Sequence, residues 1–204
     1  MPKLNIGSSS CHLNDWINLE YDEGYWRKNT FSNEVLSPKA TRSMPDVFGN
    51  ATDLSDLYKD NTFDVVRSSH VIEHIPQGQT ISAIRECYRI LKPDGIVRIV
   101  VPDIAFFIDK WINKDDNKDW WDVQLSDRGL YCDSELKRPF ANVDDAFVHL
   151  LYLNGHHLTA FTPELLKYYM ELVGFKNIER CDKEEEDIPD CTVCDYSLRL
   201  KGVK

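Results

Sequence analysis

The sequence predicts an α/β fold built on a mostly parallel sheet, and three observations lead to this prediction. Phe63–Val66 and Ile96–Val101 are short apolar runs rich in β-branched residues, as expected for strands buried on both faces of a parallel sheet. Between them, Pro93 and Gly95 predict the end of a helix. Apolar residues recur at helical spacing before that end, at Ile81, Ile84, Tyr88 and Leu91. A strand, a crossover helix and a second strand form a right-handed βαβ unit.

Polar residues follow both strands of this unit. Ligands of such sheets bind beyond the carboxyl ends of the strands, where this sequence has Arg67–His70 and then Pro102 and Asp103. The segments SSHVIEHI and RILKPDGIVRIVVPD resemble class I S-adenosylmethionine-dependent methyltransferases. The closest resemblance is to a small branch with the pattern HvlEH…LKPgG, common among sugar and small-molecule methyltransferases. It extends from Leu4 to the C-terminus.

This resemblance implies a Rossmann-like class I methyltransferase fold over residues 1–204 as a single domain. Its sheet would be mostly parallel and seven-stranded, with helices on both faces and a C-terminal antiparallel hairpin. The implied cofactor is S-adenosylmethionine, with S-adenosylhomocysteine as the product. Residues 104–160 correspond to the insertion that determines substrate specificity in the family. The family's usual helix before the first strand has no counterpart before Leu4, so we expect either one domain of a longer protein or a short branch of the family.

Leu4–Gly7 is predicted to be the first strand, running into a turn of serines. By resemblance this turn is the family's glycine-rich first loop, where the backbone approaches the cofactor and N–H groups face its carboxylate end. This sequence departs from that pattern, because only Gly7 is present and serines stand where further glycines are usual. The cofactor contacts implied in this stretch are at Asn5, Gly7, Ser8 and Ser9.

Trp16–Asp22 is predicted to be the second strand, with an acidic end. In dinucleotide-binding folds, a carboxylate at this position accepts hydrogen bonds from ribose hydroxyls. The resemblance assigns that role to Glu20, with Asp22 as the second choice.

Asp46–Leu54 resembles the third strand of the family and its following turn. The family's acid in that turn contacts the adenine amino group. Asn50 stands at this position, beside Ala51, and its side-chain carbonyl can accept the same hydrogen bond. Asp53 is a neighbouring alternative.

The resemblance also places Ser68, Ser69 and His70 under the methionine part of the cofactor. Glu73 and His74 follow as part of the family signature, and we expect their role to be mainly structural. The spacing H-x-x-E-H is also that of an inverted metalloprotease motif. A zinc site of that kind needs a helix that holds both histidines on one face. Here the motif follows a strand and soon meets Pro76 and Gly78, so we expect no zinc site.

The insertion is predicted to contain helices at Ala105–Ile112 and Val143–Leu153. Between them lies an acid-rich stretch with aromatic residues. Flat aromatic faces beside acids and amides suit a sugar or another polar ring, although packing of the insertion onto the sheet explains them equally well. The aromatic candidates for substrate binding are Trp111, Trp120, Trp121 and Tyr131.

The last part of the chain has clear helix boundaries. Thr162 is a predicted N-cap, Pro163 suits the first helical position, and Gly174 suits the end. Phe175–Cys181 and Val193–Leu200 then predict a final antiparallel pair of strands.

Composition excludes several classes of protein. The chain has 24 basic and 34 acidic residues, a formal net charge of −10, and so acidic a protein is a poor candidate for binding nucleic acid. No apolar run approaches the roughly 20 residues needed to span a membrane, and no signal-peptide pattern is present. Cys191 and Cys194 form the only CxxC pair, which favours reduced thiols over a metal site. We therefore expect a cytoplasmic protein with neither a nucleic-acid nor a membrane partner.

The implied reaction transfers a methyl group from a sulfonium to a nucleophile. The site must align the reacting groups and exclude water, and an alcohol acceptor also needs a general base. Histidine suits this role near neutral pH. The candidates are His157 and His156, then His149, with Asp103 as an alternative base or orienting partner. A divalent metal held by Asp103 and insertion acids is an alternative to the base, but the sequence shows no clear ligand cluster, so a metal is not expected.

The predicted acceptor is a hydroxyl of a sugar, as a glycan or nucleotide sugar, or of another small polar compound. Two alternatives stay open. One is methylation of a protein or of a nitrogen atom in a metabolite. The other is a non-catalytic methyltransferase-like domain that binds a partner, which the altered first loop suggests. A nicotinamide-dependent enzyme is disfavoured, because the pyrophosphate needs closer backbone approach than one glycine allows.

Overall fold

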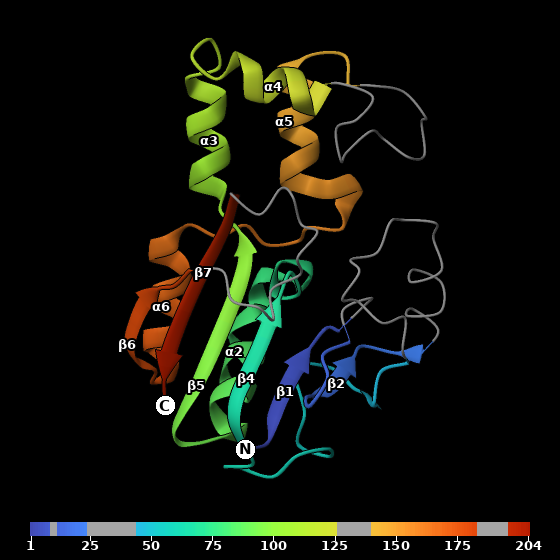
Figure 1. Ribbon diagram of the computed structural model, residues 1–204, viewed down its shortest axis with the longest axis vertical. Coiled ribbons are helices and arrows are strands. Elements are labelled where there is room, and N and C mark those ends of the chain that lie inside the picture. The colour runs from blue at the N-terminus through green and yellow to red at the C-terminus, as the bar shows by residue number, and fades with distance from the viewer. Residues whose placement is uncertain (9–11, 24–43, 126–139, 183–195) are drawn as a thin grey trace.

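The computed structural model describes residues 1–8, 12–23, 44–125, 140–182 and 196–204. Within these ranges, seven strands form one sheet in the order β3-β2-β1-β4-β5-β7-β6 (Figure 1). The first five pair in parallel, and β7 pairs antiparallel with both β5 and β6. The strands are β1 (Lys3–Ile6), β2 (Ile17–Glu20), β3 (Val47–Phe48), β4 (Phe63–Ser69), β5 (Leu91–Pro102), β6 (Lys176–Arg180) and β7 (Ser197–Val203).

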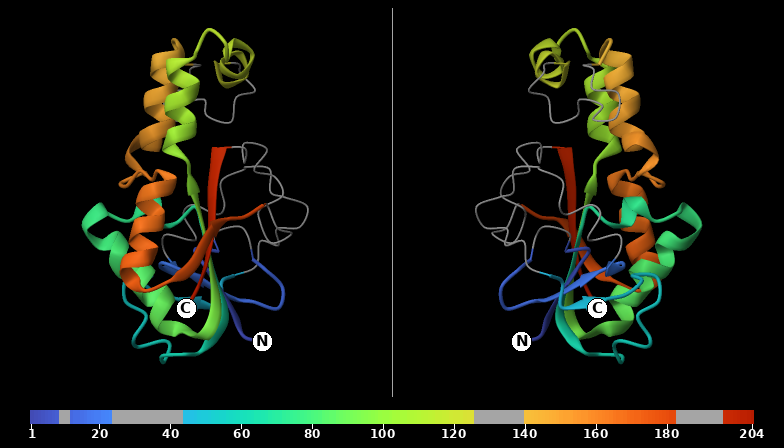
Figure 2. Two further views of the ribbon diagram at one scale, coloured as in Figure 1. Left: turned by 90° about the vertical axis from the view of Figure 1, so that its left-hand side faces the viewer. Right: turned by 90° about the vertical axis from the view of Figure 1, so that its right-hand side faces the viewer.

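The helices fall into two groups. The first, α2 and α6, lies on one face of the sheet (Figure 2). The second, α3 to α5, stands beyond the carboxyl ends of β4 and β5, at the top of Figure 1. The helices are α2 (Gln77–Ile90), α3 (Ile104–Ile112), α4 (Lys118–Leu125), α5 (Val143–Tyr152) and α6 (Pro163–Val173), with short 3-10 turns η1 (Ile72–His74) and η2 (Leu153–Gly155). Every described helix is too short or too polar to cross a bilayer.

The boundaries of α6 confirm the prediction from its sequence. The hydroxyl of Thr162 accepts a hydrogen bond from the N–H of Leu165 at 3.2 Å, and Pro163 is the first helical residue. Gly174 ends the helix with φ of 120°, where an L side chain would be strained. These local interactions define both ends of the helix. Its buried residues pack it against the sheet.

The end of α2 differs from the prediction. The helix stops at Ile90, before Pro93, and Leu91 is already extended and paired with Phe63. Proline disfavours helical backbone at the residue before it, which here is Lys92. Pro93 and Gly95 therefore lie inside β5 rather than in a separate turn.

The main apolar core lies between the sheet and the helices α2 and α6. Alternate residues of the central strands point into it, such as Leu4, Val66 and Val97, each 0% exposed. From the helices, Ile84 and Leu166 are equally buried. The period of two along the strands thus fixes which side chains meet the helices.

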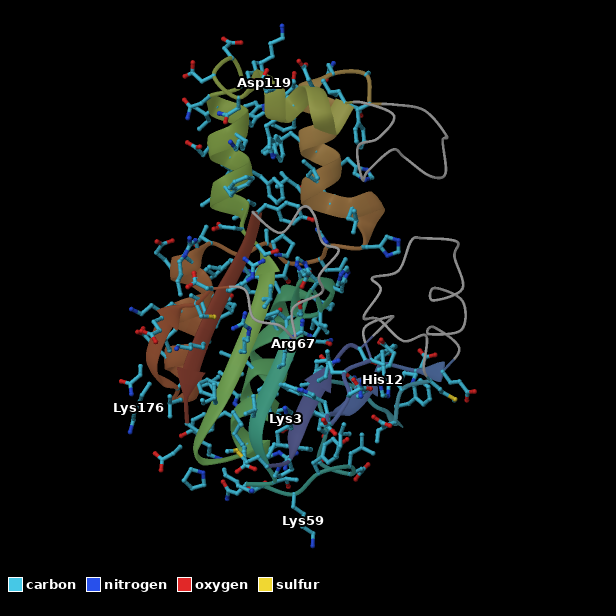
Figure 3. All side chains as sticks on the ribbon, viewed as in Figure 1. Lys3, His12, Lys59, Arg67, Asp119 and Lys176 are labelled. Carbon is cyan, nitrogen blue, oxygen red and sulfur yellow. The ribbon has the colours of Figure 1, made fainter. Side chains whose placement is uncertain are left out.

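A row of polar side chains crosses the other face of the sheet. Strand register places four of them side by side on β2, β1, β4 and β5: Asn18, Asn5, Arg67 and Arg98. Arg67, labelled in Figure 3, is only 2% exposed, and its Nη1 donates to Oδ1 of Asn5 at 2.8 Å. Asn5 in turn donates to Asn18 at 3.1 Å. The two arginines are therefore buried parts of the sheet.

The C-terminal pair of strands confirms the predicted antiparallel hairpin, with a shift in its second strand. β7 begins at Ser197 and continues to Val203, and it lies between β5 and β6. Residues 193–195, where the sequence predicted its start, lie outside the described residues.

Candidate active site

A cavity of about 540 Å³ opens at the carboxyl ends of β1 to β4. This volume is within the range typical of pockets for small molecules and cofactors. Strand order changes direction between β1 and β4, so the cavity lies at the switch point where open α/β sheets bind ligands. Loops after each of these strands, the start of α2, and Gly155, His156 and Leu158 line it.

The turn after β1 brings one of its predicted residues to the cavity. Gly7 lines it with φ of 68°, and a Cβ at this position would lie 2.2 Å from Cγ2 of Val71. Ser8 is buried beneath the wall, 1% exposed. Asn5 belongs to the polar row on the sheet. Ser9 lies outside the described residues.

The ends of β2 and β3 bring three more predicted residues to the wall. Glu20 lines the cavity and is 6% exposed, and its Oε1 accepts from the N–H of Tyr21 at 2.8 Å. Asn50 and Ala51 also line it. Oδ1 of Asn50 accepts from the N–H and hydroxyl of Thr52 at 3.0 and 2.9 Å. This fixes the amide beside the cavity.

The end of β4 turns sharply at His70. This residue has φ of 54° and lines the cavity, whereas Ser68 and Ser69 are buried in the strand. Its Nδ1 lies 3.2 Å from Oε1 of Glu73, and its Nε2 lies 3.1 Å from the hydroxyl of Ser197. The imidazole therefore links β4, the following turn and β7.

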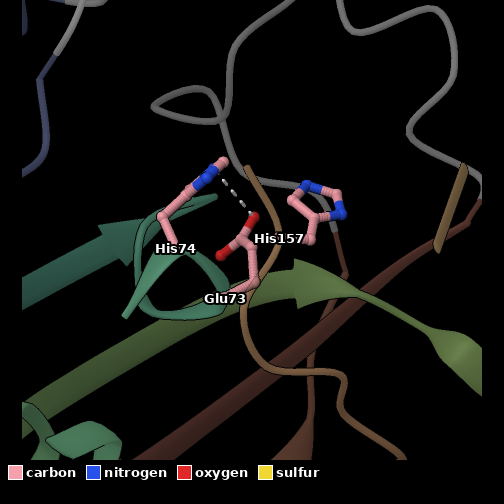
Figure 4. Close-up of side chains that lie close together, drawn as sticks. All are labelled: Glu73, His74 and His157. Atoms are coloured by element: carbon pink, nitrogen blue, oxygen red, sulfur yellow. Dashed lines mark ion pairs between the residues drawn. The ribbon is translucent and has the colours of Figure 1, made fainter. Parts of the chain in front are cut away.

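Glu73, His74 and His157 form a cluster next to the cavity (Figure 4). Glu73 is 1% exposed, and Oε1 lies 3.8 Å from Nε2 of His74. The rings of His74 and His157 are 5.1 Å apart. The backbone carbonyl of Glu73 accepts from the N–H groups of Leu158 and Thr159 at 2.8 and 3.0 Å, which ties the end of the insertion to η1. The resemblance marks Glu73 and His74 as a family signature, but the sequence does not predict their contact with His157.

Burial and neighbouring charges shift the pKa values of this cluster in opposite directions. Burial alone would raise the pKa of Glu73, but the hydrogen bond from His70 and the positive charge that His70 and His74 can hold outweigh it, so the pKa is lowered. Burial lowers the pKa of His157, although the charge of Glu73 opposes this. At neutral pH the cluster therefore combines a carboxylate with a neutral imidazole.

The structure places the three candidate histidines in different environments. His156 is exposed and lines the cavity. His157 lies beside it in the partly buried cluster. The ring of His149 packs 4.9 Å from that of Phe140 in the insertion, and this histidine is not part of the described cavity wall.

Asp103 has structural partners. Its carboxylate caps α3 by accepting from the N–H of Ala105 at 3.1 Å, and its other oxygen accepts from Nη2 of Arg180 at 2.6 Å. It is 7% exposed and is not part of the described cavity wall. These contacts favour a structural role over that of a general base.

The tryptophans of the insertion pack within it. Trp121 is 1% exposed, and its indole N–H donates to the carbonyl of Lys110 at 2.9 Å. Trp120 contacts it edge-on at 4.7 Å. Trp111 stacks on Phe147 at 5.1 Å. None of the three belongs to the described cavity wall. Trp121 is a core residue, whereas Trp111 is 38% exposed, and Tyr131 lies outside the described residues.

Comparisons with known proteins agree with this geometry. The model of the family described as "Methyltransferase domain" matches residues 25–99. The fold is similar to that of a SAM-dependent methyltransferase from Archaeoglobus fulgidus, at 14% identity and a TM-score of 0.55, with 100% of this chain and 86% of that chain covered. A putative methyltransferase from Bacillus halodurans is 14% identical with a TM-score of 0.52, covering 100% and 92%. No curated protein matches the sequence.

These comparisons agree with the observed fold. The matched segment contains β3, β4, α2 and most of β5, and so includes the turn with Glu73 and His74. The chain is thus similar to methyltransferases in its fold and, over residues 25–99, in its sequence.

Proposed function

We propose that the protein transfers a methyl group from S-adenosylmethionine to a hydroxyl of a sugar, as a glycan or nucleotide sugar, or of another small polar compound. The observation that supports this most is the make-up of the cavity at the switch point. Gly7, Glu20 and Asn50 lie on its wall at the ends of three successive strands, and His156 reaches the same cavity from the insertion.

The cavity suits the proposed cofactor in size and chemistry. Because Gly7 has no side chain, its turn can pack directly against Val71 at the cavity wall. The carboxylate of Glu20 is an acceptor suited to ribose hydroxyls, while Asn50 and Ala51 offer an amide and a small apolar surface for the adenine. When bound, S-adenosylmethionine supplies a methyl group already activated by its sulfonium, so these residues need only hold and orient it.

His156 is the proposed general base. It lies on the cavity wall and is exposed, so an acceptor can reach its imidazole. It would take the proton from the acceptor hydroxyl as the methyl–oxygen bond forms, a contribution of about 10²–10⁴ in rate for such bases. His70 and His74 lie on the same wall, so three imidazoles among the described residues line the cavity.

A screen of acceptors with methyl-labelled cofactor tests the acceptor class. Free sugars, nucleotide sugars, peptides and amine metabolites are incubated in parallel, with His156→Gln as the matched variant. We expect label in a hydroxyl compound and a large loss in the variant. Label only in amines or peptides would contradict the proposed acceptor, and no turnover with any acceptor despite cofactor binding would favour a non-catalytic domain.

A further inference from the structure

Glu73, His74 and His157 together have the composition of a metal site. Each offers one ligand atom, and these three atoms lie within 4.8 Å of one another. Two of the residues come from η1, after β4, and the third from the segment between η2 and α6. Figure 4 shows both imidazoles beside the carboxylate. The fold therefore assembles two imidazoles and a carboxylate from segments that are distant in sequence.

Backbone carbonyls orient both histidines in the way that metal-bound histidines are oriented. Nδ1 of His74 lies 3.0 Å from the carbonyl oxygen of His156, and Nδ1 of His157 lies 3.3 Å from that of Leu151. A carbonyl can only accept, so each Nδ1 must hold a proton. In a neutral ring this leaves Nε2 with its lone pair, and such second hydrogen bonds fix the tautomer of metal ligands.

The carboxylate provides a second, independent observation. Glu73 is 1% exposed, and its Oε2 is buried with no hydrogen-bond partner among the described residues. Its Oε1 is shared between His70 and His74. A buried carboxylate oxygen without a partner is costly. The other oxygen, Oε1, lies 3.8 Å from Nε2 of His74, and in a neutral His74 the two atoms would face each other lone pair to lone pair. A bound cation removes both unfavourable features.

The ligand types select the kind of cation. Imidazole suits zinc and other late transition metals, whereas magnesium and calcium prefer oxygen ligands. Two histidines and one glutamate, with a remaining position open, are the protein ligands of catalytic zinc sites. His74 also lines the cavity, so an open position at this cluster is within reach of a bound molecule.

We propose that Glu73, His74 and His157 bind a divalent transition metal ion, zinc in first place, beside the methyl-transfer cavity. This departs from the expectation of no metal. The role of this ion in the reaction rests on the proposed function. At its open position the ion would bind the hydroxyl oxygen of the acceptor and lower the pKa of that hydroxyl. The O–H bond then breaks with its proton going to His156, while the oxygen forms its bond to the methyl group and the methyl–sulfur bond breaks.

Metal binding is tested first without any activity assay. The full chain is freed of metal with a chelator and titrated with Zn²⁺ by calorimetry and with Co²⁺ by visible absorption. We expect one ion per chain and the Co²⁺ spectrum of a four-coordinate site. His74→Ala should weaken Zn²⁺ binding on the order of 100-fold, no less than the loss of an outer-sphere partner does.

Matched variants separate this site from nearby histidines. His156→Gln should keep Zn²⁺ affinity, since the backbone carbonyl that accepts from Nδ1 of His74 is retained in the variant. Glu73→Gln should lose binding. If burial makes that variant unstable, His74→Ala still tests the site, because His74 is only partly buried. No binding of either ion, binding of Mg²⁺ alone, or equal Zn²⁺ affinity in the wild type and His74→Ala would overturn the proposal.

Titration with S-adenosylmethionine on the same samples distinguishes the two proposals. Zn²⁺ binding without cofactor binding would leave the metal site standing and remove the proposed function. Cofactor binding without Zn²⁺ binding would do the reverse.

Discussion

A Cβ atom at Gly7 would lie 2.2 Å from Cγ2 of Val71. The turn after β1 therefore touches the turn after β4, and the absence of a side chain at Gly7 lets both reach the cavity. Gly7 also has φ of 68°, a conformation that costs other residues about 1 kcal/mol or more.

Gly7→Ala should weaken S-adenosylmethionine binding at least about tenfold and lower the free energy of unfolding by about 1–3 kcal/mol. The double variant Gly7→Ala/Val71→Ala removes the collision but keeps the backbone strain. It should recover part of the affinity. Calorimetry and urea unfolding measure the two effects, and an unchanged cofactor affinity in Gly7→Ala would contradict the position assigned to this loop.

Asp103 should matter for stability rather than catalysis. Asp103→Ala removes the N-cap of α3, at a cost of about 1 kcal/mol. Arg180 is mostly exposed, so its ion pair adds at most about 1 kcal/mol. Asp103→Asn should retain most of the stability, because asparagine also caps helices. Urea unfolding compares the three proteins, and a loss of turnover in Asp103→Asn at unchanged stability would return this residue to the list of candidate bases.

Stability should fall in acid because of Glu86. The guanidinium of Arg89 donates two hydrogen bonds to its carboxylate, at 2.7 and 2.8 Å, and lowers the pKa of that carboxyl below its ordinary 4.5, against the opposing effect of burial. A lowered folded pKa contributes stability above the unfolded value, and this is lost as the pH falls through the folded value. Glu86→Gln should be less stable at pH 7 and lose less between pH 5 and pH 3. Parallel urea curves for the two proteins would contradict this.

The thiol of Cys87 should be unreactive in the folded protein. It is 2% exposed, and burial raises its pKa to about 12, so almost no thiolate is present at pH 8. Brief treatment with iodoacetamide should leave Cys87 unmodified in buffer and alkylate it in urea, as read by peptide mass mapping. Rapid alkylation in buffer would show that the core over α2 opens readily.

The sequence predicts the elements whose boundaries are set locally. Thr162, Pro163 and Gly174 determine the ends of α6 by direct contacts within the helix, and the apolar runs rich in β-branched residues predict the central strands β4 and β5. The sequence predicts the end of α2 too late in the chain. Pro93 restricts the backbone of the residue before it, so the chain becomes extended before the proline itself.

The site is predicted less completely, for a physical reason. Gly7, Glu20 and Asn50 lie at strand ends, and parallel strand ends meet at one edge of a sheet. The contact of Glu73 and His74 with His157 depends on how the insertion returns to the sheet, which no periodicity encodes. Aromatic content likewise does not tell a binding face from a core, and Trp121 is in the core.

Calorimetric titration with S-adenosylmethionine and S-adenosylhomocysteine, using Glu20→Ala as the paired variant, tests the cofactor site most directly. We expect micromolar binding of both ligands to the wild type and clearly weaker binding to the variant, because the ribose loses its carboxylate acceptor. No heat from either ligand, together with an unchanged melting temperature, would contradict a cofactor site in this cavity.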